Sequence, residues 1–286
     1  MGKRIVLFND LPGYGKVALA AMVPLFSRMG HFPYQVPTAV VSNTLDFGKF
    51  RIQDMTDYMR DTIKVWDELG FDPDCICTGF VLSEEQVELI GDYIRSRKPR
   101  IDEIQNVNNG RLVMVDPIMA DGGKLYNGIG MERVAAMRKL VSYSDVMVPN
   151  MTEAGFLTGI CPGRERASAS ELRELVDGLH KLSGKSVVIT SAHDSETDEH
   201  LVCGYDHKSG QYFRVPFIFF PVRVAGSGDI FSTVMTGKLL NGESLEAAVR
   251  EAVRVLTMLI RENQSHLDEY KGILVERYWK LLDENN

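Results

Sequence analysis

Short apolar runs alternate with longer stretches of helical periodicity along most of this chain, and this alternation constrains its fold most. The runs are nearly continuous in apolar character, which is typical of strands buried on both faces of a parallel sheet. Six such strands are predicted, at Arg4–Phe8, Gln35–Val41, Cys75–Thr78, Leu112–Val115, Val146–Val148 and Val187–Thr190. Helices must then cover both faces, so the sequence predicts an α/β fold: a three-layer α/β/α sandwich with a mostly parallel central sheet.

Helical periodicity fills the intervals between these strands. Helices are predicted at Lys16–Met29, Gln53–Leu69, Glu84–Ser96, Met131–Leu140, Glu153–Leu157 and Ser170–Leu182, and then at Asp229–Leu240, Leu245–Arg261 and around Tyr270–Leu282. Leu201–Tyr205 and Tyr212–Val215 flank a polar stretch and predict an antiparallel hairpin. No linker, internal repeat or low-complexity tract interrupts the sequence, so a single domain over residues 1–286 is predicted.

Composition and charge exclude several classes of protein. The chain carries 32 Lys and Arg against 39 Asp and Glu, and no basic run stands out, so we do not expect nucleic-acid binding. The first apolar run, Ile5–Phe8, is too short for a signal-peptide core, and no stretch approaches the roughly 18 apolar residues of a membrane-spanning helix. Four cysteines without paired metal-ligand spacing are typical of reduced thiols, which favours a cytoplasmic protein that does not act at a membrane.

Polar residues gather where the predicted strands end. They follow the first strand at Asn9–Lys16, another at Asp116–Gly123, a third at Pro149–Glu153 and a fourth at Thr190–Ser191. The carboxyl ends of parallel strands meet at one edge of a sheet, where ligands bind in open α/β folds. We therefore expect the functional site at this edge.

A small-residue turn, Ala225–Gly228, runs into Asp229 and then into an apolar helix. Glycines let the backbone curl around a ligand. The first amides of a helix have no internal acceptors and lie at the positive end of its dipole, which suits a phosphate or a developing negative charge. Asp229 adds a carboxylate able to take a proton from a hydroxyl. These parts together can transfer a phosphoryl group to an alcohol.

Each of these patterns also has a purely structural interpretation. Asp229 can be an ordinary helix cap in a common loop. Asn150 and Glu153, three residues apart at a helix start, suit phosphate and metal-bound water but equally suit a cap formed by Asn150 or Thr152. Asp116 and Asp121 suit a hydrated cation but also suit two turns. A dinucleotide-binding site is disfavoured because Ala18 stands where the third glycine of the motif belongs.

Taken together, four motifs resemble the ribokinase-like superfamily, and within it the pyridoxal/pyridoxamine kinases. They are Gly226-Ser227-Gly228-Asp229, Asn150-x-x-Glu153, Asp116-Pro117-Ile118-Met119-x-Asp121 and Val188-x-Thr190-Ser191. Softer matches are Pro37–Asn43, Thr78-Gly79-Phe80 and Leu125-Tyr126, and the resemblance runs in order from residue 4 to about 260.

The resemblance implies a homodimeric kinase that uses ATP and Mg²⁺, with a K⁺ requirement left open, to phosphorylate the 5′-hydroxymethyl group of a pyridine-type vitamin B6 vitamer. It implies that Asp229 is the base and that Gly226, Ser227 and Gly228 present amides to the migrating phosphoryl group. The other implied roles are ATP binding by Asp116, Asn150, Glu153, Thr190, Ser191 and Tyr126, metal binding by Asp121 and Glu153, and substrate binding by Asp10, Tyr14, Ser42, Leu45, Phe80 and Asp229.

The sequence departs from this family where substrate is chosen. Asp10 occupies the place of a frequent serine, Leu45 that of a polar ring contact, and Phe80 that of a frequent tyrosine. Asp10 is suited to pair with a protonated pyridine nitrogen or an aminomethyl group. Hydroxymethylpyrimidine kinase and a non-catalytic vitamer-binding protein stay open as alternatives. A sugar kinase is disfavoured, because Lys16–Pro33 leaves little room for a lid and Pro12, Tyr14, Leu45 and Phe80 suit a flat ring.

Overall fold

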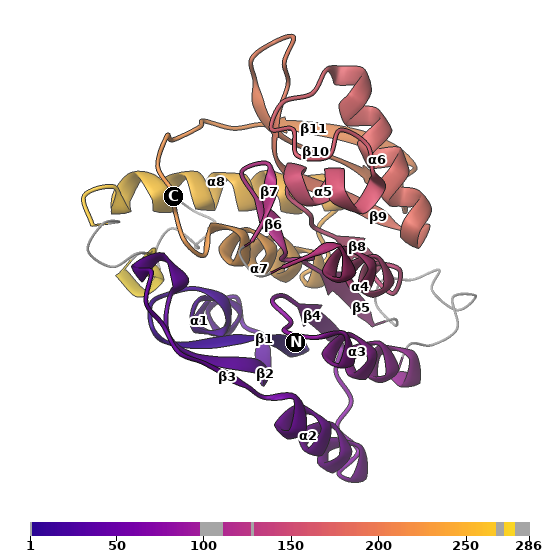
Figure 1. Cartoon of the computed structure of the whole chain (residues 1–286), viewed down its shortest axis with the longest axis vertical. Helices are drawn as coiled ribbons and strands as arrows, with labels where there is room; N and C mark the ends of the chain where they lie inside the picture. Colours follow the sequence, from indigo (N-terminus) through magenta and orange to yellow (C-terminus); the bar gives the residue numbers. More distant parts are fainter. Residues whose placement is uncertain (1, 98–110, 127–128, 267–271, 278–286) are drawn as a thin grey trace. The chain divides into compact units, whose positions relative to one another are not determined.

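The computed structural model describes residues 2–97, 111–126, 129–266 and 272–277, and the chain divides into two compact units (Figure 1). Unit 1 consists of Met1–Leu82, Arg97–Arg111 and Phe220–Asn286, and unit 2 of Ser83–Ser96 and Leu112–Phe219. The prediction of a single domain over residues 1–286 stays a prediction.

Unit 1 is built around a long first strand. β1 (Arg4–Tyr14) pairs in parallel with β2 (Phe32–Asn43) on one side and with β4 (Cys75–Thr78) on the other, and β3 (Ile52–Asp54) pairs antiparallel with β2. The helical elements of this unit are α1 (Ala18–Arg28), the 3₁₀ turn η1 (Leu45–Phe47), α2 (Thr56–Glu68), α7 (Ser227–Leu240) and α8 (Leu245–Asn263). α1 packs against both β1 and α7, and α7 packs against α8.

In unit 2, β5 (Leu112–Val115), β8 (Val146–Met147) and β9 (Ser186–His193) are parallel neighbours, and β10 (His200–Asp206) and β11 (Gln211–Pro216) extend them antiparallel. A small hairpin is formed by β6 (Ala120–Asp121) and β7 (Lys124–Leu125). The helices are α3 (Glu84–Arg97), α4 (Met131–Val141), α5 (Met151–Thr158) and α6 (Ala169–Ser183). The parallel strands β5 and β8 and the first part of β9 are mostly apolar and buried, as their continuous apolar runs predict.

Most predicted elements are confirmed to within a few residues, including the hairpin of β10 and β11. Two of the differences at element boundaries have a clear physical cause. The first strand ends at Tyr14 rather than at Phe8, because after a bulge Leu11, Pro12 and Tyr14 continue to pair with β2. The helix predicted from Gln53 begins at Thr56, because Gln53 pairs with Val40 in the edge strand β3. Most of the helix predicted around Tyr270–Leu282 lies outside the described residues.

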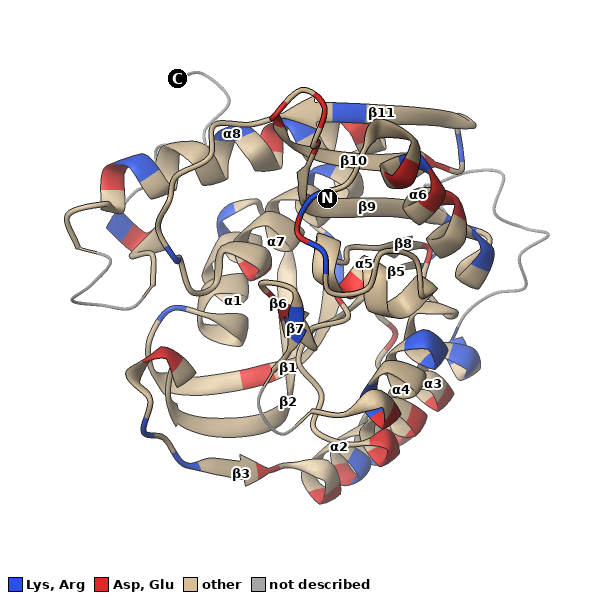
Figure 2. Ribbon diagram, turned by 45° about the horizontal axis from the view of Figure 1, so that its top comes forward, with Lys and Arg blue, Asp and Glu red and all other residues tan. Residues whose placement is uncertain are grey.

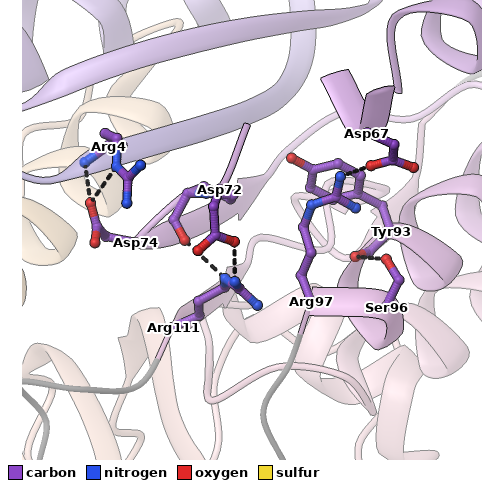
Figure 3. Close-up of polar contacts among 9 residues, drawn as sticks. Arg4, Asp67, Asp72, Asp74, Tyr93, Ser96, Arg97 and Arg111 are labelled. Atoms are coloured by element: carbon purple, nitrogen blue, oxygen red, sulfur yellow. Dashed lines mark hydrogen bonds and ion pairs between the residues drawn. The ribbon is translucent and has the colours of Figure 1, made fainter. Parts of the chain in front are cut away.

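Ion pairs tie together the amino ends of the unit 1 strands (Figure 3). The backbone N–H of Arg4, the first residue of β1, donates to the Asp74 carboxylate at 2.8 Å, immediately before β4 begins. The Arg111 guanidinium donates to the Pro73 carbonyl at 2.9 Å and pairs with Asp72, while Arg97 pairs with Asp67. The contacts of Arg4 and Arg111 lie at the amino ends of the strands, opposite the predicted site.

Acidic and basic positions are interspersed along α2 and α8, and in α3 the acidic residues precede the basic ones, so these helices do not present a continuous basic stripe (Figure 2). Among the described residues, no helix combines the length and apolar character needed to cross a bilayer.

Candidate active site

The turn that precedes Asp229 requires glycine. Gly226 caps the amino end of α7 in the left-handed region, with φ of 79°, and a Cβ atom there would lie 2.7 Å from the carbonyl oxygen of Lys16. A side chain would meet both a strained backbone and a main-chain clash. The Gly226–Asp229 segment is therefore held tightly against the loop that leads into α1.

Two N–H donors hold the Asp229 carboxylate. The Asn9 side-chain amide donates to Oδ1 at 3.0 Å, and the backbone N–H of Ala18 donates to Oδ2 at 2.8 Å. Ala18 is a non-glycine residue with φ of 47°, a conformation disfavoured for L-residues that recurs at functional sites. Each carboxylate oxygen thus accepts one fixed donor, which orients the group relative to β1 and α1.

Asp229 and Asp10 both resist ionisation. Partial burial raises the pKa of the Asp229 carboxyl above its ordinary value, and the N–H groups of Ala18 and Asn9 oppose this rise. Loss of hydration, reinforced by the charge of Asp229, raises the pKa of Asp10 to about 7. A carboxylate whose pKa is raised toward neutrality is a stronger proton acceptor, which suits a general base.

The amides at the start of α7 are not all equivalent. The Ser227 N–H already donates to the Val224 carbonyl at 3.3 Å. The N–H groups of Gly228 and Asp229 lie in the first turn, where the helix itself supplies no acceptor. These two amides are the better candidates for receiving negative charge, and Gly226 contributes mainly the turn.

Phe80 lies beside the Asp229 group through Asn9. Its backbone N–H donates to Asn9 Oδ1 at 2.8 Å, and its carbonyl accepts from the Thr38 hydroxyl at 2.7 Å. The carboxyl end of β4, a bulged part of β2 and the carboxyl half of β1 are therefore joined around Asp229. Of the predicted substrate residues, the structure brings Asp10 and Phe80 to this point.

The other predicted substrate residues gather elsewhere in unit 1. Tyr14 and Leu45 are exposed, and the Tyr14 ring meets the Phe47 ring edge-on with centroids 5.6 Å apart. The Ser42 hydroxyl donates to Asn43 and accepts from the Arg51 N–H at 2.8 Å, so it is engaged in the β2–β3 connection. Tyr14 and Leu45 are therefore apolar side chains on the surface of unit 1, while Ser42 has a structural role in this conformation.

Asn150 and Glu153 form a helix cap in unit 2. The Asn150 side chain accepts from the Glu153 N–H at 2.9 Å, and Glu153 Oε2 accepts from the Asn150 N–H at 2.8 Å, which is a reciprocal capping box on α5. Glu153 Oε1 also accepts from the Met119 N–H at 3.0 Å. Asn150 and Glu153 thus form the helix cap that their spacing suits. The Glu153 side chain also holds the segment after β5 against α5.

Burial raises the pKa of Glu153 well above its ordinary value, and the negative charge of Asp116 raises it further. Two buried carboxyl groups that repel each other favour a nearby cation, so this oxygen-rich pair fits a hydrated Mg²⁺. Asp121 is exposed and accepts from the Gly122 N–H at 2.9 Å. Within the described residues, no three acidic, His or Cys side chains converge in a ready-made metal cage.

Three further predicted nucleotide residues lie along the same edge of unit 2. The Thr190 N–H donates to the Pro149 carbonyl at 2.9 Å, which places Thr190 beside Asn150. Ser191 follows in the left-handed region with φ of 54° and is exposed. The Tyr126 N–H donates to the Met119 carbonyl at 3.0 Å. Asp116, Asn150, Glu153 and Thr190 thus converge, with Tyr126 anchored beside the β6–β7 hairpin.

Sequence reasoning assigned no role to Asn9 or Ala18. Asn9 gave a usable signal, because it begins the polar segment that follows the first apolar strand run. Ala18 gave none, because it acts through a backbone N–H, which every residue type except proline carries.

Comparison with known proteins agrees with this geometry. The phosphomethylpyrimidine kinase family model matches residues 20–274. The chain is 30% identical over 254 residues to a pyridoxine/pyridoxal/pyridoxamine kinase of Bordetella avium, which covers 86% of this chain and 81% of that one.

Solved structures give the same picture. A Bacteroides thetaiotaomicron protein, provisionally named a phosphomethylpyrimidine kinase and crystallised with pyridoxal, superimposes with a TM-score of 0.90 at 32% identity, covering 99% of this chain and 96% of that one. A pyridoxal kinase of Lactobacillus plantarum has a TM-score of 0.86 at 24% identity, over 98% and 96% of the two chains, and shares the fold. The predicted α/β fold with a large, mostly parallel sheet is confirmed.

Proposed function

The chain belongs to the phosphomethylpyrimidine kinase family and, within the ribokinase-like superfamily, to the pyridoxal kinases, and we propose that it transfers the γ-phosphoryl group of ATP to the 5′-hydroxymethyl group of a vitamin B6 vitamer. The observation that carries this proposal is the Asp229 carboxylate, held by Asn9 and Ala18 at the amino end of α7 beside the first-turn amides of that helix.

In the proposed reaction, Asp229 accepts the proton of the substrate hydroxyl as its oxygen attacks the γ-phosphorus. The amides of Gly228 and Asp229 receive the negative charge that develops on the phosphoryl oxygens, with Gly226 and Ser227 shaping the turn. The protein thus acts by positioning and by charge stabilisation, as is usual in phosphoryl transfer.

ATP is assigned to the unit 2 residues Asp116, Asn150, Glu153, Thr190 and Ser191, with Tyr126 limiting the access of water. Mg²⁺, when bound, would neutralise phosphate charge. Asp116 and Glu153 would hold it through its waters, since both Glu153 oxygens already accept backbone N–H groups. Asp121 is exposed and is proposed as a ligand of the same hydrated metal. Replacing K⁺ by Na⁺ in the assay tests the monovalent requirement.

The substrate ring is assigned to the unit 1 residues. Asp10 would bind a cationic or hydrogen-bonding ring substituent, and Phe80, Tyr14 and Leu45 would provide apolar contact with its faces. Ser42 would serve by holding the β2–β3 connection over the ring. Hydroxymethylpyrimidine is a second candidate substrate, favoured by the family model that matches the chain.

We further propose that the enzyme acts in the cytoplasm as a single-domain protomer of a homodimer. Large apolar side chains of unit 1 are exposed on β2, on α2 and at the residue that follows α2, namely Phe32, Tyr34, Val40, Tyr58, Val65 and Leu69. Such a concentration is typical of a surface that another protein covers.

The test is ATP- and Mg²⁺-dependent phosphorylation of pyridoxal, pyridoxamine, pyridoxine and hydroxymethylpyrimidine by the purified protein, with Asp229→Asn in parallel. We expect turnover on at least one vitamer and a loss of about 10²–10⁴-fold in kcat for the variant, the range typical of a general base. Absence of turnover on all four alcohols, or full activity of the variant, would contradict the proposal.

A further inference from the structure

Asn9 occupies an unusual position for a polar side chain. It is 1% exposed, it lies on β1 where the pairing with β2 shifts register, and its side chain makes four contacts. Oδ1 accepts from the backbone N–H groups of Asp10 at 3.0 Å and Phe80 at 2.8 Å. Nδ2 donates to Asp229 Oδ1 at 3.0 Å and contacts Met22 Sδ at 3.3 Å. Three sequence-distant segments therefore meet at one amide.

The orientation of this amide is determined by its partners. If it were flipped, its NH₂ group would face two N–H donors and its oxygen would face the Asp229 carboxylate. Both arrangements are repulsive, so only the observed orientation satisfies all the groups. The donor half of Asn9 must then point at Asp229.

The surroundings leave this side chain no alternative place. A Cβ atom on Gly79 would lie 2.4 Å from Asn9 Nδ2, so the space beside the amide exists only because residue 79 is glycine. Phe80, which donates to Asn9, is itself held by the Thr38 hydroxyl. Asn9 is therefore a rigid donor, and a rigid donor favours the ionised form of the group that it faces.

Resting on the proposed function, we infer that Asn9 is a positioning residue: its side-chain N–H holds the Asp229 carboxylate in the orientation and the ionised form that proton transfer requires. It holds Oδ1 while the Ala18 N–H holds Oδ2, and it does not itself exchange a proton.

Other charged groups face this site and must be considered in a pH experiment. From β1, Asp10 interacts electrostatically with Asp229. On the loop before α1, Lys16 is paired with Glu276. The packed face of α1 contributes the Ala18 N–H, and β4 contributes the Phe80 N–H through Asn9. Removing the Asn9 donor leaves only the Ala18 N–H to oppose the loss of hydration at Asp229, which makes Asp229 easier to protonate.

Two substitutions separate this role from simple packing. Asn9→Asp keeps the size and the oxygen that accepts from Asp10 and Phe80, but it turns a second carboxylate toward Asp229. Asn9→Ala removes both the oxygen that accepts from Asp10 and Phe80 and the N–H group that donates to Asp229. If Asn9 holds Asp229, the isosteric Asn9→Asp should be the more damaging change. If Asn9 only fills space and satisfies backbone N–H groups, Asn9→Ala should be the more damaging change.

The experiment measures kcat and kcat/KM against pH for the wild type, both Asn9 variants and Asp229→Asn. For Asn9→Ala we expect the acid limb of the kcat/KM profile to move to higher pH by about 1 unit. At a pH below the limb, this shift lowers kcat/KM by roughly tenfold. At high pH, kcat/KM should recover in part. For Asn9→Asp we expect a larger shift. Ionisation of the substrate is common to all enzymes, so it cancels when variants are compared with the wild type.

Asn263 supplies the matched control. It is likewise 1% exposed and its amide bonds only the backbone, donating to the Leu259 carbonyl and accepting from the Leu274 N–H. Asn263→Asp should lower stability without moving the acid limb. A direct readout is the ¹³Cγ titration of Asp229, assigned by comparison with Asp229→Asn, which should move upward in both Asn9 variants. If Asn9→Ala does not fold, Asn9→Ser takes its place.

The outcomes are distinct. Upward movement of the limb and of the ¹³C titration, with Asn9→Asp more affected than Asn9→Ala, supports the inference. An active wild type whose limb is unmoved in the Asn9 variants, or a greater loss in Asn9→Ala, overturns it while leaving the proposed kinase intact. Full activity of Asp229→Asn overturns the kinase mechanism and the inference with it.

Discussion

Asp10 is the residue through which this site should respond most to pH. Its pKa of about 7, against an ordinary value of 3.8, means that the folded protein holds a proton that the unfolded chain releases. Between these two values the folded state binds more protons, so stability falls as the pH rises through this window. Well below pH 3.8 both states are protonated and Asp10 contributes nothing.

Asp10→Asn should therefore stabilise the protein at pH 8 and have a much smaller effect at pH 4. The shift corresponds to an upper limit of about 4 kcal/mol, and because the side chain is half-buried we expect about 1–3 kcal/mol. Urea unfolding at both pH values measures the difference. Asp57→Asn is the control, because the Asp57 side chain is 94% exposed. An equal effect of Asp10→Asn at pH 4 and pH 8 would contradict the assignment.

Asp10 should also govern the choice of substrate. A cationic aminomethyl group beside Asp10 would stabilise its ionised form, whereas an aldehyde would not. Asp10→Ser should then reduce kcat/KM for pyridoxamine more than for pyridoxal, by roughly tenfold, the value of one lost charged contact of about 1.4 kcal/mol. Competition between the two vitamers in one assay measures this ratio directly. If Asp10→Ser leaves this ratio unchanged, Asp10 does not distinguish the amine of pyridoxamine from the aldehyde of pyridoxal.

At the scale of single elements, sequence reasoning succeeded where a segment carries a distinct chemical pattern. The turn before α7 was predicted from its glycines, and α5 from the spacing of Asn150 and Glu153. The edge strand β3 was missed because three residues give no usable periodicity. The continuation of β1 to Tyr14 was missed because Pro12 and Gly13 are typical of a turn, whereas pairing with β2 overrides that preference.

The loop after β4 should act on Asp229 through Asn9. Gly79→Ala would place a methyl group against the Asn9 amide, so its effect should resemble that of Asn9→Ala. In the Asn9→Ala background the clashing atoms are absent, so Gly79→Ala should cost less there. A double-mutant cycle on kcat/KM measures this coupling, for which neighbours in contact typically give about 0.5–3 kcal/mol. Additive effects would show that the β4 loop acts by another route.

At the scale of the whole molecule, the alternation of strands and helices and the class of fold could be predicted from the sequence. Both follow from the length and spacing of apolar runs, which indicate the segments that are buried. It could not predict the division into two compact units, which depends on contacts between segments far apart in the chain. If the chain is a single domain, as predicted, we expect it to unfold in one cooperative transition. The calorimetric and van't Hoff enthalpies of unfolding should then be equal.

The exposed apolar side chains of unit 1 lead to the last prediction, that two copies of this 32.1-kDa chain associate. Tyr58 and Val65 are separated by two turns of α2 and share a face, and Val40 is exposed on the neighbouring strand β2. A charge placed in a buried interface without a partner opposes association. Sedimentation equilibrium should therefore give a dimer for the wild type and a monomer for the Tyr58→Glu/Val65→Glu variant. Met131→Glu, at a position 58% exposed at the start of α4 in unit 2, should stay dimeric. If the wild type is monomeric at micromolar concentration, a second copy does not cover the apolar face of α2 and β2 and the dimer prediction is wrong.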